Sequence, residues 1–155
     1  MNKEEQVMAE FRDLFNKMAW LNKQKMEERL EGYQSSEAHC IEYIGGHIDA
    51  NVTKLAEAFY MTRGAMSKVT KKLMAKDLIE SYQKPENKKE IYFRLTLHGR
   101  EIYEIHEALH QSFRERDKAV FGQVTDAQFD GMLDFIETYR QHLDNEIKKL
   151  GIVEL

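Results

Sequence analysis

The sequence predicts a mainly α-helical fold with one small β-hairpin. Only one proline and eight glycines occur in 155 residues, while 42% of the chain is apolar and 32% is charged. Apolar residues recur at helical spacing over most of the chain, and a strand-like alternation is confined to residues 79–83 and 91–95. A chain of this length buries an ordinary core without disulfides or structural metal, so we expect a single domain over residues 1–155.

Two terminal segments, residues 1–31 and 121–155, are expected to form dimerisation helices. The first helix is amphipathic and should end near Leu30, before Gly32. The last, from about Thr125, carries an apolar stripe over roughly seven turns. The two stripes comprise Val7, Phe11, Leu14, Met18 and Leu21, then Phe129, Met132, Leu133, Ile136, Tyr139, Leu143, Ile147 and Leu150. A stripe this long exceeds what a small core needs, which predicts a homodimer; an intramolecular bundle is the alternative.

Three helices are expected between these ends in addition to the most basic one. Ser35 or Ser36 can cap a second helix that stops at Gly45-Gly46. Asn51 can cap a third helix over residues 52–59. Beginning at Thr96, a connecting helix should cover residues 97–120.

The fourth helix, capped by Thr62, has one face for packing and one for solvent. Met66, Val69, Thr70 and Leu73 point one way, whereas Gly64, Ser67, Lys68 and Lys71 point the other. Two short strands joined by a turn-rich loop, residues 84–90, follow it. Helix, turn, basic helix and hairpin in this order predict a winged helix-turn-helix over residues 35–96.

Positive charge is concentrated in this region. Nine Lys or Arg and four acidic residues lie between Met61 and Arg94, a surplus of five, although the whole chain has a net charge of −4. The rest of the chain therefore carries −9. A protein with this distribution repels polyanions everywhere except along one helix and one loop, where a phosphate backbone can dock.

The arrangement resembles the MarR family of transcriptional regulators over essentially the full length. The resemblance rests on residues 52–56, on residues 62–69 with Leu73 and Leu78-Ile79, and on residues 95–99 after the hairpin. It implies a homodimeric repressor with two winged domains in successive major grooves of a palindromic operator. It further implies an effector that changes the spacing of the recognition helices.

Residues of the basic helix and hairpin are assigned to DNA by their chemistry. Recognition helices read bases with their N-terminal residues, so Arg63, Ser67 and Lys68 are expected at base edges, and Thr62 at the start of the helix is also assigned to the DNA-binding surface. The remaining cations are expected at phosphates, where they orient without specifying sequence: Lys71, Lys72, Lys84, Lys88 and Lys89. Family members commonly carry Asp-x-Arg at the wing tip, where this chain has Asn87 and Lys89. Either Lys88 or Lys89 is the candidate for minor-groove insertion.

Three histidines form a candidate effector site. His106 and His110 lie four apart, on one face of the connecting helix, and His39 begins the second helix. In the zinc-sensing branch of the family, histidines at the corresponding places bind metal, which implies a tetrahedral zinc site with one carboxylate. Glu27, Glu28, Glu37 and Glu107 are the candidates for the fourth ligand. The alternatives are a hydrogen-bond network linking helices and a pocket for a small apolar effector bordered by Phe113, Tyr43 and Trp20.

Other classes of function are disfavoured. Gly-rich phosphate loops, Ser nucleophile elbows and paired cysteines are absent from the sequence, so we do not expect an enzyme. The single cysteine, Cys40, is expected to be an inert core residue rather than a peroxide sensor. Signal peptides and membrane spans are not apparent, which predicts a cytoplasmic protein without a membrane partner. A winged domain that binds proteins instead of DNA is the competing class, and it usually lacks a cationic recognition face.

Overall fold

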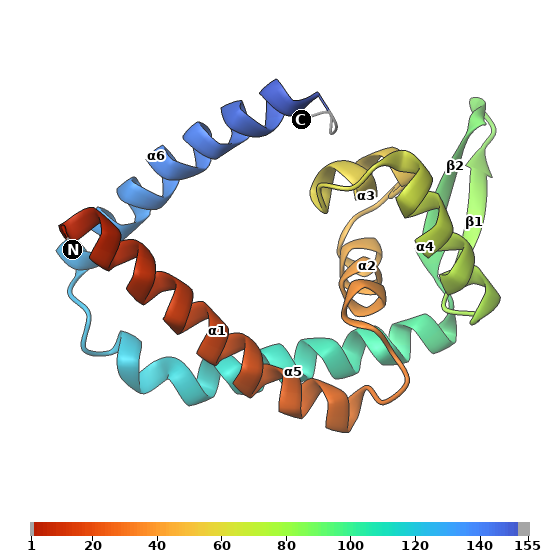
Figure 1. Ribbon diagram of the computed structural model, residues 1–155. Helices are drawn as coiled ribbons and strands as arrows, with labels where there is room; N and C mark the ends of the chain where they lie inside the picture. The colour runs from red at the N-terminus through yellow and green to blue at the C-terminus, as the bar shows by residue number, and fades with distance from the viewer. Residues whose placement is uncertain (1, 152–155) are drawn as a thin grey trace.

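The computed structural model describes residues 2–151 as a mainly helical protein with a single hairpin (Figure 1). The elements are α1 (Lys3–Arg29), α2 (Ser35–Gly46), α3 (Val52–Ala58), α4 (Arg63–Ala75), β1 (Ile79–Lys84), β2 (Asn87–Leu95), α5 (Leu97–Phe121) and α6 (Asp126–Leu150). The predicted fold class is confirmed. Residues 152–155 of the expected dimerisation segment lie outside the described residues.

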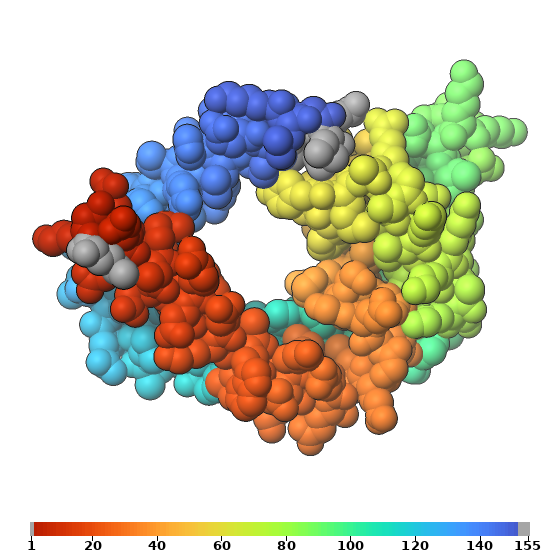
Figure 2. All heavy atoms as spheres, in the orientation of Figure 1, coloured from red at the N-terminus to blue at the C-terminus, as the bar shows by residue number. Residues whose placement is uncertain are grey.

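Helix α5 connects the two ends of the molecule. In Figure 1, α2, α3, α4 and the hairpin, together called the winged unit, gather at the N-terminal end of α5. Helix α1 lies along α5, and α6 turns back from its far end. Figure 2 shows an opening between these two helices and the winged unit. The winged unit therefore stands apart from α6 and is tied to it through α5.

Most helices begin where the sequence indicates. The side chains of Asn51, Thr62, Thr96 and Thr125 each accept a hydrogen bond from a backbone N–H three residues later. Such bonds satisfy donors that the first helical turn leaves without partners, and each stabilises a helix by about 1 kcal/mol. The locations of α3, α4, α5 and α6 thus follow from local sequence.

The predicted cap of α2 is wrong. Gln34, rather than Ser35 or Ser36, is the capping residue, and both serines lie inside the helix. The backbone N–H of Gln34 donates to the Glu37 carboxylate at 3.3 Å. Glu37 is buried and also accepts from the Lys76 ammonium at 2.7 Å. A tertiary ion pair therefore sets the position of this carboxylate, and the carboxylate sets the start of α2.

The hydrophobic core lies within the winged unit and the first half of α5. Its fully buried side chains include Ile41, Leu55, Met66, Leu73 and Leu78. Thr70 and Leu73 of α4 are buried as predicted, and Val69 is half-buried beside them. Packing this face inward leaves the opposite, cationic face of α4 in solvent.

The hairpin, or wing, has a shorter turn than the sequence predicts. Lys84 pairs with Asn87, so only Pro85 and Glu86 form the turn, instead of a loop over residues 84–90. Residues 87–90 are polar and exposed on both faces, so apolar alternation cannot reveal that they belong to β2. The wing is consequently an antiparallel ribbon with a register shift between Tyr82 and Lys84, rather than a long loop.

One close approach fixes the angle at which α5 leaves the wing. The Leu78 carbonyl accepts the Thr96 N–H at 3.1 Å, and the Thr96 hydroxyl donates to the Asp77 carbonyl at 2.6 Å. Gly99 lies so near that a Cβ there would sit 1.9 Å from the Leu78 oxygen. Only a residue without a side chain allows this contact.

We expect Gly99→Ala to lower the free energy of unfolding by about 2–3 kcal/mol, as for overpacked cores. The reason is that either the Leu78 backbone or α5 must shift. Urea unfolding followed by circular dichroism measures the change. Gly64→Ala is the matched control, because a Cβ at Gly64 meets nothing within 4 Å. Equal stabilities for the two variants would contradict the close approach.

Candidate functional site

The recognition helix α4 presents its cations to solvent. Arg63, Lys68, Lys71 and Lys72 are exposed, and Ser67 is half-buried among them. The Thr62 side chain accepts from the Ala65 N–H at 3.1 Å, so its oxygen is committed to the cap. These cations lie at and after the helix N-terminus, whose dipole adds partial positive charge. The combined field can attract a phosphate backbone.

The wing tip adds two exposed lysines, Lys88 and Lys89, which follow Asn87 at the start of β2. The Asn87 side chain accepts the Lys89 N–H at 3.2 Å, and the Lys88 carbonyl accepts from the Gln83 amide at 2.7 Å. These bonds fix the backbone of both lysines.

Lys84 occupies a different environment from the other predicted phosphate contacts. Its ammonium donates to the Asp49 carboxylate and lies 4.9 Å from the centre of the Tyr92 ring. Asp49 is in the loop between α2 and α3, and its carboxylate also accepts from the Tyr82 hydroxyl at 2.7 Å. Sequence analysis missed Asp49, because no local pattern connects position 49 with a strand more than thirty residues later.

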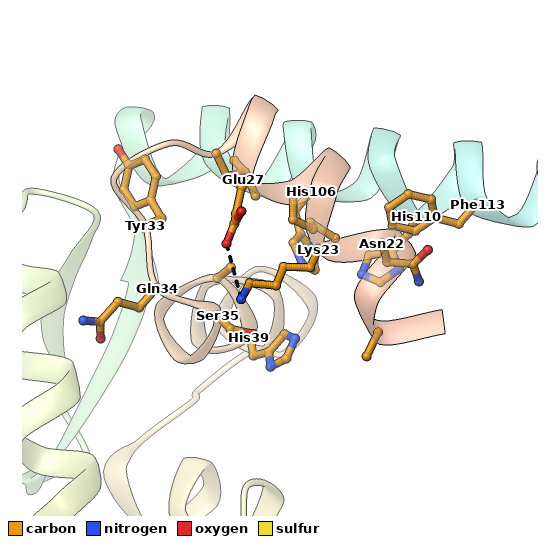
Figure 3. A pocket seen from close by; sticks show the side chains of 14 residues that line it. Asn22, Lys23, Glu27, Tyr33, Gln34, Ser35, His39, His106, His110 and Phe113 are labelled. Carbon is orange, nitrogen blue, oxygen red and sulfur yellow. Dashed lines mark ion pairs between the residues drawn. The ribbon is translucent and has the colours of Figure 1, made fainter. Parts of the chain in front are cut away.

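A cavity of about 580 Å³ lies where α1, α2 and α5 meet (Figure 3). Its lining is mostly apolar and includes Met26, Leu30 and Phe113, with His39, His106 and His110 among the polar groups. The sequence correctly placed Phe113 at this junction. Two other predicted residues are not in the lining: Tyr43 borders a separate cavity between α2, α3 and α5, and Trp20 on α1 is 66% exposed. The rotation of α2 and α1 about their axes decides where these two side chains lie, and periodicity alone does not determine that rotation.

The predicted histidines converge, but with a different carboxylate. His106 and His110 have ring centres 4.4 Å apart, and His106 Nδ1 lies 3.6 Å from Glu42 Oε2. One ligand atom from each of Glu42, His106 and His110 lies within 4.8 Å of the other two; we call these residues the histidine cluster. His39 is next to it, with its ring centre 6.1 Å from that of His106, but does not belong to this group.

None of the four carboxylates predicted as the fourth ligand is in the cluster. Glu37 pairs with Lys76, Glu27 with Lys23 (Figure 3) and Glu28 with Lys25, while Glu107 borders the separate cavity. Glu42 takes that place. Its position three residues after His39, on the same face of α2, is the signal that sequence analysis overlooked.

Two nitrogens of the cluster lack hydrogen-bond partners among the described residues. These are His106 Nδ1 and His110 Nε2, both buried. Burial lowers the pKa of His106 from its ordinary value near 6.5, the proximity of His110 lowers it further, and Glu42 opposes the shift. The His106 imidazole is therefore neutral at neutral pH. Neutral imidazole is the form that binds metal, so the chemistry of this donor set suits a divalent ion such as zinc.

The MarR family model matches residues 34–91, which cover α2, α3, α4 and most of the wing. The chain is 32% identical over 113 residues to the HTH-type transcriptional regulator PchR of Bacillus subtilis, covering 64% of this chain and 67% of PchR. The chain belongs to the MarR family. It is also 31% identical over 93 residues to the uncharacterized HTH-type transcriptional regulator YhjH of the same organism, spanning about half of that protein (53%) and 60% of this chain.

Solved structures of MarR regulators share the fold. The FabT protein of Streptococcus pneumoniae, crystallised in complex with DNA, superposes with a TM-score of 0.78 at 18% identity, covering 92% of this chain and 99% of FabT. A MarR/EmrR family regulator from Acinetobacter sp. ADP1 gives a TM-score of 0.70 at 23% identity, covering 94% and 99%. At these identities the likeness extends to the fold, and the relatives in sequence are transcriptional regulators.

Helices of the described chain do not have the combination of length and apolar character that a membrane crossing requires.

Cys40 lies inside the core of the winged unit. Its side chain is buried, and its sulfur lies 3.9 Å from the sulfur of Met66. Burial raises the pKa of the Cys40 thiol to about 11, and the negative charge of Glu37 contributes to the shift. A thiol of this kind is a poor nucleophile, which argues against a peroxide sensor.

We expect native Cys40 to react with iodoacetamide at pH 8 at least about 100-fold more slowly than in the urea-unfolded chain. The raised pKa reduces the thiolate fraction by about this factor, and burial adds a steric barrier. Mass spectrometry of quenched samples measures the rates. Equal labelling of native and unfolded protein would show that the thiol is reactive after all.

Proposed function

We propose that this protein is a homodimeric, DNA-binding repressor that acts on a palindromic operator and responds to an effector. The observation that carries the proposal is the exposure of the cations of α4 and the wing tip in a chain whose remaining charge is negative. The relation to HTH-type regulators and the likeness to a protein crystallised with DNA support it. A winged domain that binds proteins does not need such a field.

Each group of DNA-facing residues has a distinct role. In this proposal Arg63, Ser67 and Lys68, just after the Thr62 cap, meet base edges in the major groove. Lys71 and Lys72 on α4 contact the phosphates that flank this groove, and Lys88 or Lys89 reaches the adjacent minor groove. The polar character of these side chains, and the exposure of all of them except the half-buried Ser67, are consistent with the assignments.

A second copy of the chain is the proposed partner of α1 and α6. Neither helix has a single buried residue, although both carry long apolar stripes. Large side chains on these helices are substantially exposed, among them Phe15 (58%) and Leu133 (61%). The apolar area left open is larger than scattered surface residues account for, and a twofold-symmetric dimer would cover it. Two copies would also place two recognition helices on the half-sites of a palindrome.

We expect Lys71→Ala and Lys88→Ala each to weaken binding to all duplexes about equally and to flatten the plot of log K against log salt by about one unit. Fluorescence anisotropy with duplexes from the chromosome around its own gene, at several salt concentrations, measures this. Lys118→Ala, on α5 away from the winged unit, is the control and should not change the slope. Arg63→Ala should instead relax the preference for one base at one operator position, because Arg63 is proposed to meet a base edge. Unchanged slopes for both lysine variants would contradict the docking mode, and no binding by the wild type would favour the protein-interaction alternative.

The effector site is proposed to be the histidine cluster at the edge of the cavity. Its unsatisfied nitrogens and the neutral state of His106 favour zinc, with Glu42, His106 and His110 as ligands and His39 nearby. When bound, zinc would supply a crosslink between α2 and α5. The protein residues would keep the imidazoles neutral and exclude water from them. The competing effector is a small apolar molecule in the cavity lined by Met26, Leu30 and Phe113.

We expect the wild type to bind zinc in a calorimetric titration, and the double variant His106→Gln/His110→Gln to bind at least about tenfold more weakly, because two ligands are lost. His142→Gln, on exposed α6, is the matched control and should leave the affinity unchanged. Identical affinities for the wild type and the double variant would remove the cluster as a metal site. If the wild type gave no heat with zinc, a small apolar molecule would remain as the candidate effector.

A further inference from the structure

Residues 49–51, the loop between α2 and α3, connect the wing to the helix-turn-helix at three points. The Asp49 carboxylate accepts from Tyr82 and Lys84 of β1. The Ala50 carbonyl accepts from the Phe93 N–H of β2 at 2.8 Å. The Asn51 amide donates to the Glu90 carboxylate of β2 at 3.5 Å, while its oxygen caps α3. A two-stranded ribbon is marginally stable alone, so these contacts hold the wing in place.

Asp49 contributes an ion pair to this connection. Its φ of 61° lies in the left-handed region, which Asp tolerates better than most residues. The Lys54 ammonium donates to the Asp49 carbonyl at 3.0 Å and so supports this backbone conformation. The bonds from Lys84 and then Tyr82 lower the pKa of the Asp49 carboxyl, so it is ionised at neutral pH. The ion pair is partly shielded, with side-chain exposures of 32% for Lys84 and 24% for Asp49.

The ion pair affects how Lys84 can be used. The charge of an ammonium held by a half-buried carboxylate is largely compensated, so it gains less from a phosphate than the exposed ammonium groups of Lys88 and Lys89 at the tip. Arg94, a second cation of the wing, is likewise paired, with Glu80 at 2.8 Å, and lies 5.0 Å from the centre of the Tyr82 ring. Positive charge at the base of the wing is therefore engaged within the protein, and charge at the tip is available to DNA.

We propose that Asp49 is a specificity-determining, positioning residue for DNA binding. It keeps Lys84 off the phosphate backbone and uses it to hold the wing at a set angle to the recognition helix. This inference rests on the proposed DNA docking through α4 and the wing tip. It replaces the expectation that Lys84 contacts phosphate with a structural role for that lysine. The contribution of the wing to operator preference then depends on a residue outside the wing.

The test measures salt dependence and operator preference for Asp49→Asn, Lys84→Met and the double variant. Asn keeps an oxygen for the Tyr82 hydroxyl but removes the charge that holds Lys84. We expect Asp49→Asn to steepen the log K against log salt slope by about one unit, as freed Lys84 joins the phosphate contacts. The ratio of operator to nonspecific affinity should fall by roughly tenfold, comparable to one mismatched base pair. Lys84→Met alone should leave the slope unchanged, and the double variant should return to the wild-type slope.

Asp77→Asn is the matched control. Asp77 has a φ of 58°, close to the 61° of Asp49, and undergoes the same change in charge, but it is not bonded to Lys84. Its slope should stay at the wild-type value. The inference would be overturned by a flatter slope for Lys84→Met in the wild-type background, or by equal slopes for Asp49→Asn and Asp77→Asn.

Failure of a variant to fold and failure of the proposed function can each be told apart from failure of this inference. If Asp49→Asn does not fold, as judged by circular dichroism, the Lys84→Met slope decides by itself: an unchanged slope supports the positioning role and a flatter one refutes it. If the wild type binds no duplex at all, the proposed function fails, and this inference fails with it. If the wild type binds a duplex but the variants do not show the expected slopes, only the role of Asp49 is refuted.

Discussion

The contact between the start of α5 and the end of the helix-turn-helix is the constraint on which the arrangement of the molecule depends. Gly99 lies against the Leu78 carbonyl, and the Thr96 N–H and hydroxyl bind the carbonyls of Leu78 and Asp77. These contacts set the direction of a helix of 25 residues. Since α1 packs on that helix and α6 follows it, a small change at Gly99 would be amplified at the far end.

Helix α5 also unites the core with the candidate effector site. Ile102, Leu109 and Phe113 pack into the core or the cavity, and His106 and His110 lie on the same side of the helix. His106 is buried at 1% exposure, and its Nδ1 and the Nε2 of His110 have no hydrogen-bond partner among the described residues. A ligand bound at the cluster would satisfy both nitrogens. Occupancy of the cluster would thereby stabilise one position of α2 relative to α5.

The cations of this protein include some that are exposed to solvent and some that form ion pairs between elements. Lys68, Lys71 and Lys72 of α4 and Lys88 and Lys89 of the wing tip are exposed. Lys76, Lys84 and Arg94 form ion pairs with Glu37, Asp49 and Glu80, and these pairs hold elements together. A count of charges along the sequence does not separate these groups, although the surplus of five between Met61 and Arg94 falls in the segment that contains both.

The sequence by itself determined what depends on neighbouring residues: the caps at Asn51, Thr62 and Thr96, the apolar face of α4, and the shared face of His106 and His110. These follow because hydrogen bonds and side-chain periodicity within one helix are local. Only the tertiary structure decided which carboxylate joins the histidines, which residue caps α2, and which partner holds Lys84. Glu42, Gln34 with Glu37, and Asp49 take these roles through contacts between elements distant in the chain, whose relative rotation no local pattern encodes.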